Sequence, residues 1–155
     1  MQYTTLGKTG LKISEVGLGT WAFNSSVYGP VAVDDAERTI QKAREVGINF
    51  FDTAEIYSVP PTVDSYGKTE EMIGNWFEKR KNREKIILAS KVAGPGCDWI
   101  RDGGNSFDEK KIGEAINGSL KRLKTDYIDL YQLHWPERST NYFGKREYSV
   151  NKSEG

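Results

Sequence analysis

The sequence is poor in the residues that build disulfide frameworks and metal centres. Its 155 residues include a single cysteine, Cys97, and a single histidine, His134. One cysteine cannot form an internal disulfide, which suits a reducing compartment. Cys97 has no histidine or second cysteine near it at ligand spacing, so we expect no metal site.

The chain also lacks long apolar runs and an excess of charge of either sign. No apolar stretch approaches the length of a membrane span, and the first residues do not follow the basic-then-apolar pattern of a signal peptide. Lys and Arg total 22, as do Asp and Glu, so no net field favours nucleic acid or anionic lipid. We therefore expect a soluble cytoplasmic protein that binds neither nucleic acid nor membrane.

Short apolar segments alternate with helical patterns along the chain. Residues 3–14 read as a β-hairpin around Gly-Lys-Thr-Gly, and residues 16–21 read as a short strand. Further apolar segments at residues 48–52, 86–91 and 127–134 read as strands. Because helices separate these segments, we expect parallel strands joined by right-handed crossovers, which is an α/β fold.

Three helical patterns lie between the strands, each with an apolar stripe that we expect to face the sheet. The expected helix starts are Asp34 as N-cap with Glu37 at its capping-box position, residue 69, and Ser106 paired with Glu109. Gly47 is placed to end the first helix. The stripes consist of Ala36, Ile40 and Ala43; Met72, Ile73, Trp76 and Phe77; and Ile112, Ile116, Leu120 and Leu123.

The polar residues of chemical interest stand at the ends of the predicted strands. Asp52, Lys91 and His134 each end a strand, and Tyr57 follows Asp52 by five residues. An acidic group at the end of an apolar strand is costly to bury unless a cation meets it, and Lys91 can supply that cation. Because parallel barrels carry their catalytic groups at the carboxyl ends of the strands, this pattern predicts an active site.

Taken singly, each of these residues also fits a purely structural role. Asp52 and Lys91 fit a structural ion pair, and Tyr57 fits a packed loop aromatic. His134 fits a hydrogen-bonded core residue. Their joint position at one end of the predicted sheet favours the catalytic interpretation.

Two loops on the same side of the predicted sheet, 58–67 and 93–105, are expected to shape a substrate pocket. Trp21, Trp99 and Trp135 fit either an aromatic wall of that pocket or ordinary packing.

Four motifs, in order and in spacing, resemble the N-terminal half of the aldo-keto reductase family. They are Gly-Leu-Gly-Thr-Trp (17–21), Asp-Thr-Ala-Glu-Ile-Tyr (52–57), Leu-Ala-Ser-Lys (88–91) and Leu-Lys-Thr-Asp-Tyr-Ile-Asp-Leu (123–130), followed by His134. The long loop with Pro60-Pro61 and the sequence His134-Trp135-Pro136 are similar to a bacterial branch of the family related to potassium-channel β subunits. The resemblance implies a partial TIM (β/α)8 barrel whose first four βα strands are preceded by an N-terminal β-hairpin.

The resemblance also implies a chemistry, namely the reduction of aldehydes or ketones to alcohols by hydride from NADPH, with NADH left open by the residues themselves. Tyr57 matches the proton donor, and Lys91 would favour the phenolate that remains. Asp52 would hold Lys91 in place, and His134 would orient the carbonyl oxygen. The residues expected to bind the cofactor are Gly19, Thr20, Trp21, Asp52 and His134.

The chain departs from the family pattern in length, because eight βα units take about 250 residues and four strands are predicted here. We expect residues 1–155 to form a single domain in which 136–155, polar and without periodicity, is a loop or tail. Three functions remain: a reductase acting on a small-molecule carbonyl substrate, a truncated and catalytically incomplete half barrel that dimerises or binds a partner through exposed edges, and a non-catalytic redox-sensing subunit.

Overall fold

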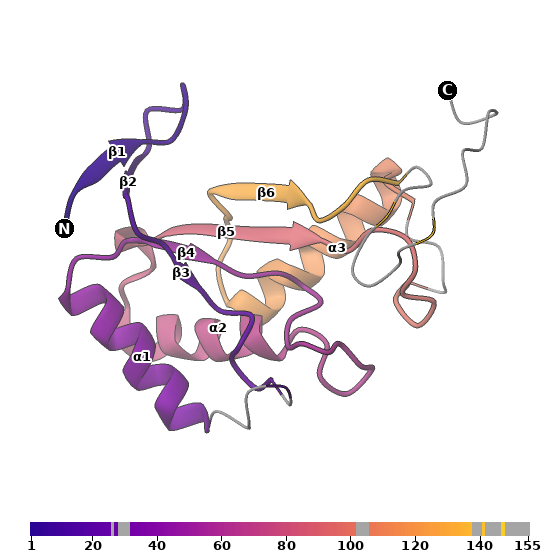
Figure 1. Cartoon of the computed structure of the whole chain (residues 1–155), viewed down its shortest axis with the longest axis horizontal. Coiled ribbons are helices and arrows are strands. Elements are labelled where there is room, and N and C mark those ends of the chain that lie inside the picture. Colours follow the sequence, from indigo (N-terminus) through magenta and orange to yellow (C-terminus); the bar gives the residue numbers. More distant parts are fainter. Residues whose placement is uncertain (26, 28–31, 102–105, 138–140, 142–146, 148–155) are drawn as a thin grey trace.

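The computed structural model describes residues 1–25, 27, 32–101, 106–137, 141 and 147. Within them, a four-stranded sheet carries three α-helices on one face, and a two-stranded hairpin stands at one end of the sheet (Figure 1). The strands are β1 Tyr3–Thr5, β2 Lys12–Ser14, β3 Leu18–Gly19, β4 Phe50–Asp52, β5 Ile87–Val92 and β6 Leu130–Leu133. The helices are α1 Val33–Glu45, α2 Lys68–Arg80 and α3 Glu109–Leu123, with a short 3-10 turn at Arg83–Lys85.

The sheet follows the order β3-β4-β5-β6, and every neighbouring pair is parallel. Each strand is therefore joined to the next by a helix that crosses one face of the sheet. The register places Asp52 beside Ala89, and Lys91 beside Gln132. This arrangement confirms the predicted partial (β/α)8 barrel, preceded by the predicted hairpin.

The main core lies between the sheet and the helices. Phe51 and Leu88 point from the sheet toward Ile40 of α1 and toward Ile73 and Trp76 of α2, and all five side chains are fully buried. Fully burying one such side chain contributes about 1.5–3 kcal/mol relative to exposure. The stripes predicted for α1 and α2 are thus the residues that attach these helices to the sheet.

The start of α1 differs from the prediction. The N-cap is Ala32, without a side-chain hydrogen bond, so the capping roles expected for Asp34 and Glu37 are wrong. Asp34 instead lies in the first turn, where its charge complements the helix dipole. Glu37 accepts a hydrogen bond from Lys79 of α2, with Nζ 2.7 Å from Oε2.

The start of α3 also differs, because a neighbouring residue provides the cap. Asp108 is the N-cap, and its Oδ1 accepts a hydrogen bond from the backbone N–H of Lys111 at 2.9 Å. Ser106 donates its hydroxyl to the Asp108 carboxylate at 2.6 Å. The predicted Ser106–Glu109 capping pair is therefore wrong, since Asp108 has the extended backbone that an N-cap needs.

The packed face of α3 is narrower and less apolar than predicted. Its buried residues are Ala115, Ser119 and Leu123, whereas Ile112, Ile116 and Leu120 are only half-buried. Gly74 of α2 allows the backbone of α3 to approach closely, since a Cβ there would lie 2.2 Å from Arg122 O. A count of large apolar residues misses this kind of contact.

The hairpin stands at the end of the sheet opposite the tips of the strand arrows (Figure 1). The side chain of Asn49 fixes it there, accepting a hydrogen bond from Ser14 N at 2.7 Å and donating one to Lys12 O at 2.9 Å. The Tyr3 hydroxyl donates to Gly47 O at 2.8 Å. Gly47 ends α1 as predicted, with a φ of +93° that glycine adopts without strain.

The segment 136–155, predicted to be a loop or tail, lies largely outside the described residues, as do positions 102–105 of the second predicted loop. Among the helices that the structure describes, none is long and apolar enough to cross a bilayer.

Candidate active site

Two adjacent strands bring a carboxylate and an amine to the face of the sheet that the helices leave uncovered. Successive strand residues point to opposite faces. Since Phe51 and Ser90 point toward the helices, Asp52 and Lys91 point away from them. Both lie at the carboxyl ends of their strands, as predicted.

Lys91 is the centre of the cluster. Its Nζ lies 2.5 Å from Asp52 Oδ1, 2.8 Å from the carbonyl oxygen of Thr53 and 3.4 Å from the hydroxyl of Tyr57. The ammonium is also 4.9 Å from the centre of the Tyr57 ring. The structure therefore brings together the acid, the amine and the phenol that the sequence placed on successive segments.

His134 lies directly after β6 and next to Tyr57. The two rings meet edge to face, with their centroids 5.7 Å apart. The backbone N–H of His134 donates to Val92 O at 3.1 Å, which ties the residue to the end of β5. All four predicted catalytic residues thus lie at one end of the sheet.

Burial determines the protonation of the two ring side chains. Burial, reinforced by the Asp52 carboxylate, raises the pKa of Tyr57 to about 12. Burial and the Lys91 charge lower the pKa of His134 to about 4. At neutral pH the phenol is therefore protonated and the imidazole is uncharged. The phenol can donate a proton, and the neutral imidazole can donate a hydrogen bond.

Of the five residues expected to bind the cofactor, the three that follow one another at the end of β3 differ in accessibility. A Cβ added at Gly19 would meet nothing within 4 Å, so the backbone there borders open space. The Trp21 residue is 40% exposed. Thr20 is fully buried, and both its N–H and its hydroxyl donate to Asp52 O at 3.0 Å. Thr20 therefore fixes the backbone of Asp52.

A pocket of about 570 Å³ opens beside Tyr57 and His134. Its lining residues are Trp21, Ile56, Tyr57, Val59, Pro60, Pro61, Pro95, Gly96, Cys97, His134 and Trp135. Mostly apolar walls around a few polar groups are typical of small-molecule sites. Of the three tryptophans considered from the sequence, Trp99 is not among the lining residues and packs edge to face on Tyr66, with centroids 5.8 Å apart.

The sequence matches the model of the Aldo/keto reductase family over residues 15–148. The chain belongs to the aldo-keto reductase family. It is similar to protein tas of Escherichia coli, at 46% identity over 99% of this chain and 44% of that protein. It is also similar to aldo-keto reductase YhdN of Bacillus subtilis, at 38% identity over 88% of this chain and 39% of YhdN.

A solved structure supports the same assignment. An aldo-keto reductase from Bacillus halodurans, in its holo form, matches with a TM-score of 0.67 and 34% identity, covering 86% of this chain and 40% of that one. This aldo-keto reductase chain thus spans less than half the length of the relatives it matches.

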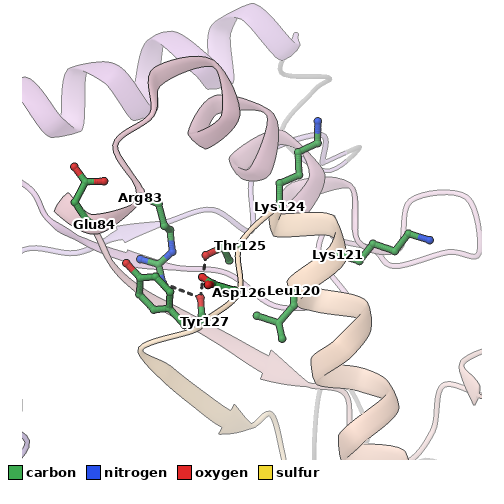
Figure 2. A pocket seen from close by; sticks show the side chains of 8 residues that line it. All are labelled: Arg83, Glu84, Leu120, Lys121, Lys124, Thr125, Asp126 and Tyr127. Atoms are coloured by element: carbon green, nitrogen blue, oxygen red, sulfur yellow. Dashed lines mark hydrogen bonds between the residues drawn. The ribbon is translucent and has the colours of Figure 1, made fainter.

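The aldo-keto reductase chain has a further hollow at the opposite end of the sheet, of about 660 Å³ (Figure 2). The Arg83 guanidinium stacks there 3.9 Å from the centre of the Tyr127 ring and donates to Asp129 at 2.8 Å. Figure 2 shows Lys121 and Lys124 directed away from this contact. Arg83 joins the amino ends of β5 and β6, so we interpret this hollow as structural.

Two polar side chains near the site were not identified from the sequence. Gln132 lies beside Lys91 on β6, and its amide donates to Asp52 Oδ2 at 3.4 Å. The sequence signal that could have identified Gln132 is its position two residues before His134, on the same face of the strand. Glu55, which lies between Asp52 and Tyr57 in the sequence, is fully buried. Among the described residues, no group of three or more His, Cys, Asp or Glu side chains could hold a metal ion.

Proposed function

We propose that the chain provides the proton-donating half of an NADPH-dependent reductase of aldehydes and ketones. The main support is the position of the Lys91 ammonium, 2.5 Å from the Asp52 carboxylate and 3.4 Å from the Tyr57 hydroxyl, beside a mostly apolar pocket. Membership of the family supports oxidoreductase chemistry. The choice of NADPH over NADH follows the preference of the family.

A bound nicotinamide cofactor supplies the hydride to the carbonyl carbon. Tyr57 donates its phenolic proton to the carbonyl oxygen as negative charge develops there. The phenolate that remains faces the Lys91 ammonium, whose charge favours it. Asp52 holds that ammonium in place by its short hydrogen bond. His134, neutral at physiological pH, donates a hydrogen bond that orients the same oxygen.

The residues around the site fit the nicotinamide end of such a cofactor. Gly19 leaves open space at the end of β3, and Trp21 offers an exposed ring beside the pocket. In our proposal Asp52 and His134 complete this surface from β4 and from the end of β6. Thr20 contributes by holding Asp52, since its own hydroxyl is used for that contact.

A chimera tests this function in the context of a full-length chain. The 155 residues replace the matching segment of YhdN, and NADPH oxidation is followed with benzaldehyde. We expect aldehyde-dependent oxidation of NADPH by the chimera. The 155-residue chain alone is expected to bind NADPH weakly or not at all, as judged by tryptophan fluorescence. A folded chimera that binds NADPH without turnover would contradict the proposal.

A second candidate function is self-association, and the edges of the sheet favour it. Within the described part of the chain, β3 and β6 each pair with a single strand, which leaves one edge of each strand open. Leu133 on β6 is 58% exposed. Open strand edges beside apolar surface favour pairing with another chain.

Sedimentation velocity over a range of concentrations tests the second candidate. We expect the sedimentation coefficient of the chain to rise with concentration, because the open edges pair. A constant monomeric value would contradict it. The chain is also similar to a probable voltage-gated potassium channel subunit beta of Arabidopsis thaliana, at 37% identity over 90% of this chain and 39% of that protein. No contact among the described residues favours a redox-sensing role.

A further inference from the structure

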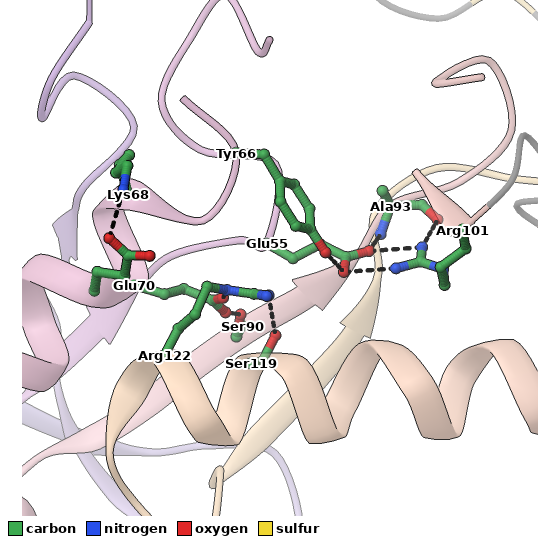
Figure 3. A network of polar contacts seen from close by, with 10 residues as sticks. Glu55, Tyr66, Lys68, Glu70, Ser90, Ala93, Arg101, Ser119 and Arg122 are labelled. Carbon is green, nitrogen blue, oxygen red and sulfur yellow. Dashed lines mark hydrogen bonds and ion pairs between the residues drawn. The ribbon is translucent and has the colours of Figure 1, made fainter. Parts of the chain in front are cut away.

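A fully buried carboxylate, that of Glu55, joins three segments around the pocket (Figure 3). It accepts hydrogen bonds from the Tyr66 hydroxyl at 2.9 Å and from the backbone N–H of Ala93 at 2.5 Å. The two terminal nitrogens of Arg101 each donate to a different oxygen of Glu55 at 2.8 Å. Four donors thus compensate a charge that would be costly to bury alone.

The Glu55–Arg101 ion pair holds the part of the loop from Ala93 to Arg101, whose middle forms one wall of the pocket. The loop starts at Ala93, directly after β5, and reaches Arg101. Between them, Pro95, Gly96 and Cys97 line the pocket. Arg101 Nη2 also lies 3.4 Å from the carbonyl oxygen of Ala93, so the same side chain also contacts the start of the loop.

The pocket side of the loop has contacts of its own. The indole N–H of Trp135 donates to Pro95 O at 2.9 Å. A Cβ added at Gly94 would lie 2.5 Å from that indole nitrogen, so the loop backbone and the ring are in close contact. The position of this wall therefore depends on the loop backbone. The Arg101 guanidinium fixes that backbone from the side away from the pocket.

We propose that the Glu55–Arg101 ion pair is a clamp that holds the loop from Ala93 to Arg101 against the pocket. Glu55 and Arg101 are then positioning residues for the substrate wall, and neither contacts the reacting atoms. The inference rests on the proposed function only in treating the pocket as the substrate site. The planar fork of Arg101 matches the carboxylate in a way that a lysine cannot reproduce.

The chain contains a second buried pair that serves as a matched control. Arg122 Nε donates to Glu70 Oε2 at 2.8 Å, and the Arg122 and Glu70 side chains are 15% and 0% exposed. The Arg101 and Glu55 side chains are 10% and 0% exposed. The Glu70–Arg122 pair lies among α2, α3 and β5, and neither residue lines the pocket (Figure 3). Arg122→Lys therefore weakens a buried ion pair outside the loop. The Arg122 guanidinium also lies 4.8 Å from the centre of the Tyr66 ring, so this control includes any loosening of Tyr66, which donates to Glu55.

Cys97 reports directly on the loop, because it is the only cysteine in the sequence and it lines the pocket. Burial raises the pKa of its thiol, the Glu55 charge raises it further, and the Arg101 charge lowers it. Charge effects alone therefore predict faster alkylation in Glu55→Gln and slower alkylation in Arg101→Gln. Release of a clamp predicts faster alkylation in both variants.

The experiment measures the alkylation rate of Cys97 by iodoacetamide in the native 155-residue chain, followed by mass spectrometry. We expect the rate to rise about tenfold or more in Glu55→Gln, Arg101→Gln and Arg101→Lys, because each loses a charge-assisted hydrogen bond that keeps the loop closed. Arg122→Lys should stay within about twofold of the wild type, since the loop keeps its clamp.

Three results would overturn the clamp. One is an unchanged rate in both Glu55→Gln and Arg101→Lys, and another is opposite changes in Glu55→Gln and Arg101→Gln. The third is a rise in Arg122→Lys as large as the rise in Arg101→Lys, which would indicate general loosening of the fold. Because the labelling needs neither cofactor nor turnover, its outcome is independent of whether the proposed reductase activity is found.

Discussion

Lys91 makes the contacts on which the proposed chemistry depends. Its ammonium is shared among the Asp52 carboxylate, the Thr53 carbonyl and the Tyr57 hydroxyl, which uses all three of its donors. Its side chain is 13% exposed, while that of Asp52 is 34% exposed. The pair is thus partly screened by solvent, which limits its contribution to stability. In the proposed function its role is to favour the Tyr57 phenolate.

The charge of Asp52 has a measurable effect on the phenol of Tyr57. Asp52 is one of the two causes that raise the pKa of Tyr57 to about 12, the larger being burial. In Asp52→Asn we expect that pKa to fall toward the ordinary value of 10.0, because the repulsion between carboxylate and phenolate is gone. Ultraviolet absorbance titration, with Tyr57→Phe to assign the signal, measures it. An unchanged or higher pKa would contradict this electrostatic description.

His134 makes the stability of the chain depend on pH in a defined window. Burial and Lys91 lower its pKa from 6.5 to about 4 in the folded state. As the pH falls from 6.5 to 4, the unfolded imidazole takes up a proton and the folded one does not. The free energy of unfolding therefore decreases over this window. In urea titrations at stepped pH, the free energy of unfolding of His134→Gln should decrease less over this window than that of the wild type. Parallel curves for the two proteins would show that the pKa of His134 is not lowered in the folded state.

Which residues could be predicted from the sequence depended on whether their partners also stand at the ends of strands. Asp52, Lys91 and His134 were found because each ends a strand, and parallel strands bring such ends together. The partner of Glu55 could not be found in this way. Arg101 lies 46 positions away in a loop without periodicity, and only the folded backbone brings the two together.

At the scale of the elements, helices α2 and α3 approach each other through backbone contacts. A Cβ added at Gly74 of α2 would lie 2.2 Å from Arg122 O and 2.7 Å from Leu123 C, both in the backbone of α3. The same helix pair contains the buried Glu70–Arg122 ion pair. The close packing at Gly74 thus occurs in the same helix pair as the Glu70–Arg122 ion pair, which joins α2, α3 and β5.

Two glycine substitutions test this packing. Gly74→Ala should destabilise the chain by about 1–3 kcal/mol, because the methyl group must displace the backbone of α3. Gly113→Ala, within α3, meets nothing within 4 Å and should stabilise by about 0.5–1 kcal/mol through helix propensity. Urea denaturation of both variants measures the difference. Equal stabilisation by the two substitutions would show that the helices are not in close contact at Gly74.

Element types and order were predictable, while element ends were less so. Hydrophobic periodicity and short strand patterns indicated three helices and four parallel strands after a hairpin. The N-caps of α1 and α3 were misassigned, because the backbone places a cap independently of residue type. Ala32 caps α1 without a side-chain hydrogen bond, and Asp108 caps α3. Residues 127–134 were expected to be one strand, whereas β6 comprises Leu130–Leu133.

At the scale of the whole molecule, the chain presents one end of a four-stranded sheet as its candidate site. Alternation of strands and helices was sufficient to predict the parallel order, because right-handed crossovers place consecutive strands side by side. The fixing of the hairpin by Asn49 could not be predicted, since the side chain pairs with residues far away in the sequence. The family model covers residues 15–148, which include the whole sheet.

Single-turnover kinetics of the YhdN chimera test most directly whether Tyr57 delivers the proton. Tyr57→Phe removes only the hydroxyl and keeps the ring beside His134. We predict that NADPH oxidation with benzaldehyde slows by about 10²–10⁴-fold, which is the usual contribution of general acid catalysis. The Kd for NADPH should stay within about twofold, since the hydroxyl acts in the transition state. Equal rates for the two proteins, or a loss explained entirely by weaker NADPH binding, would contradict the account.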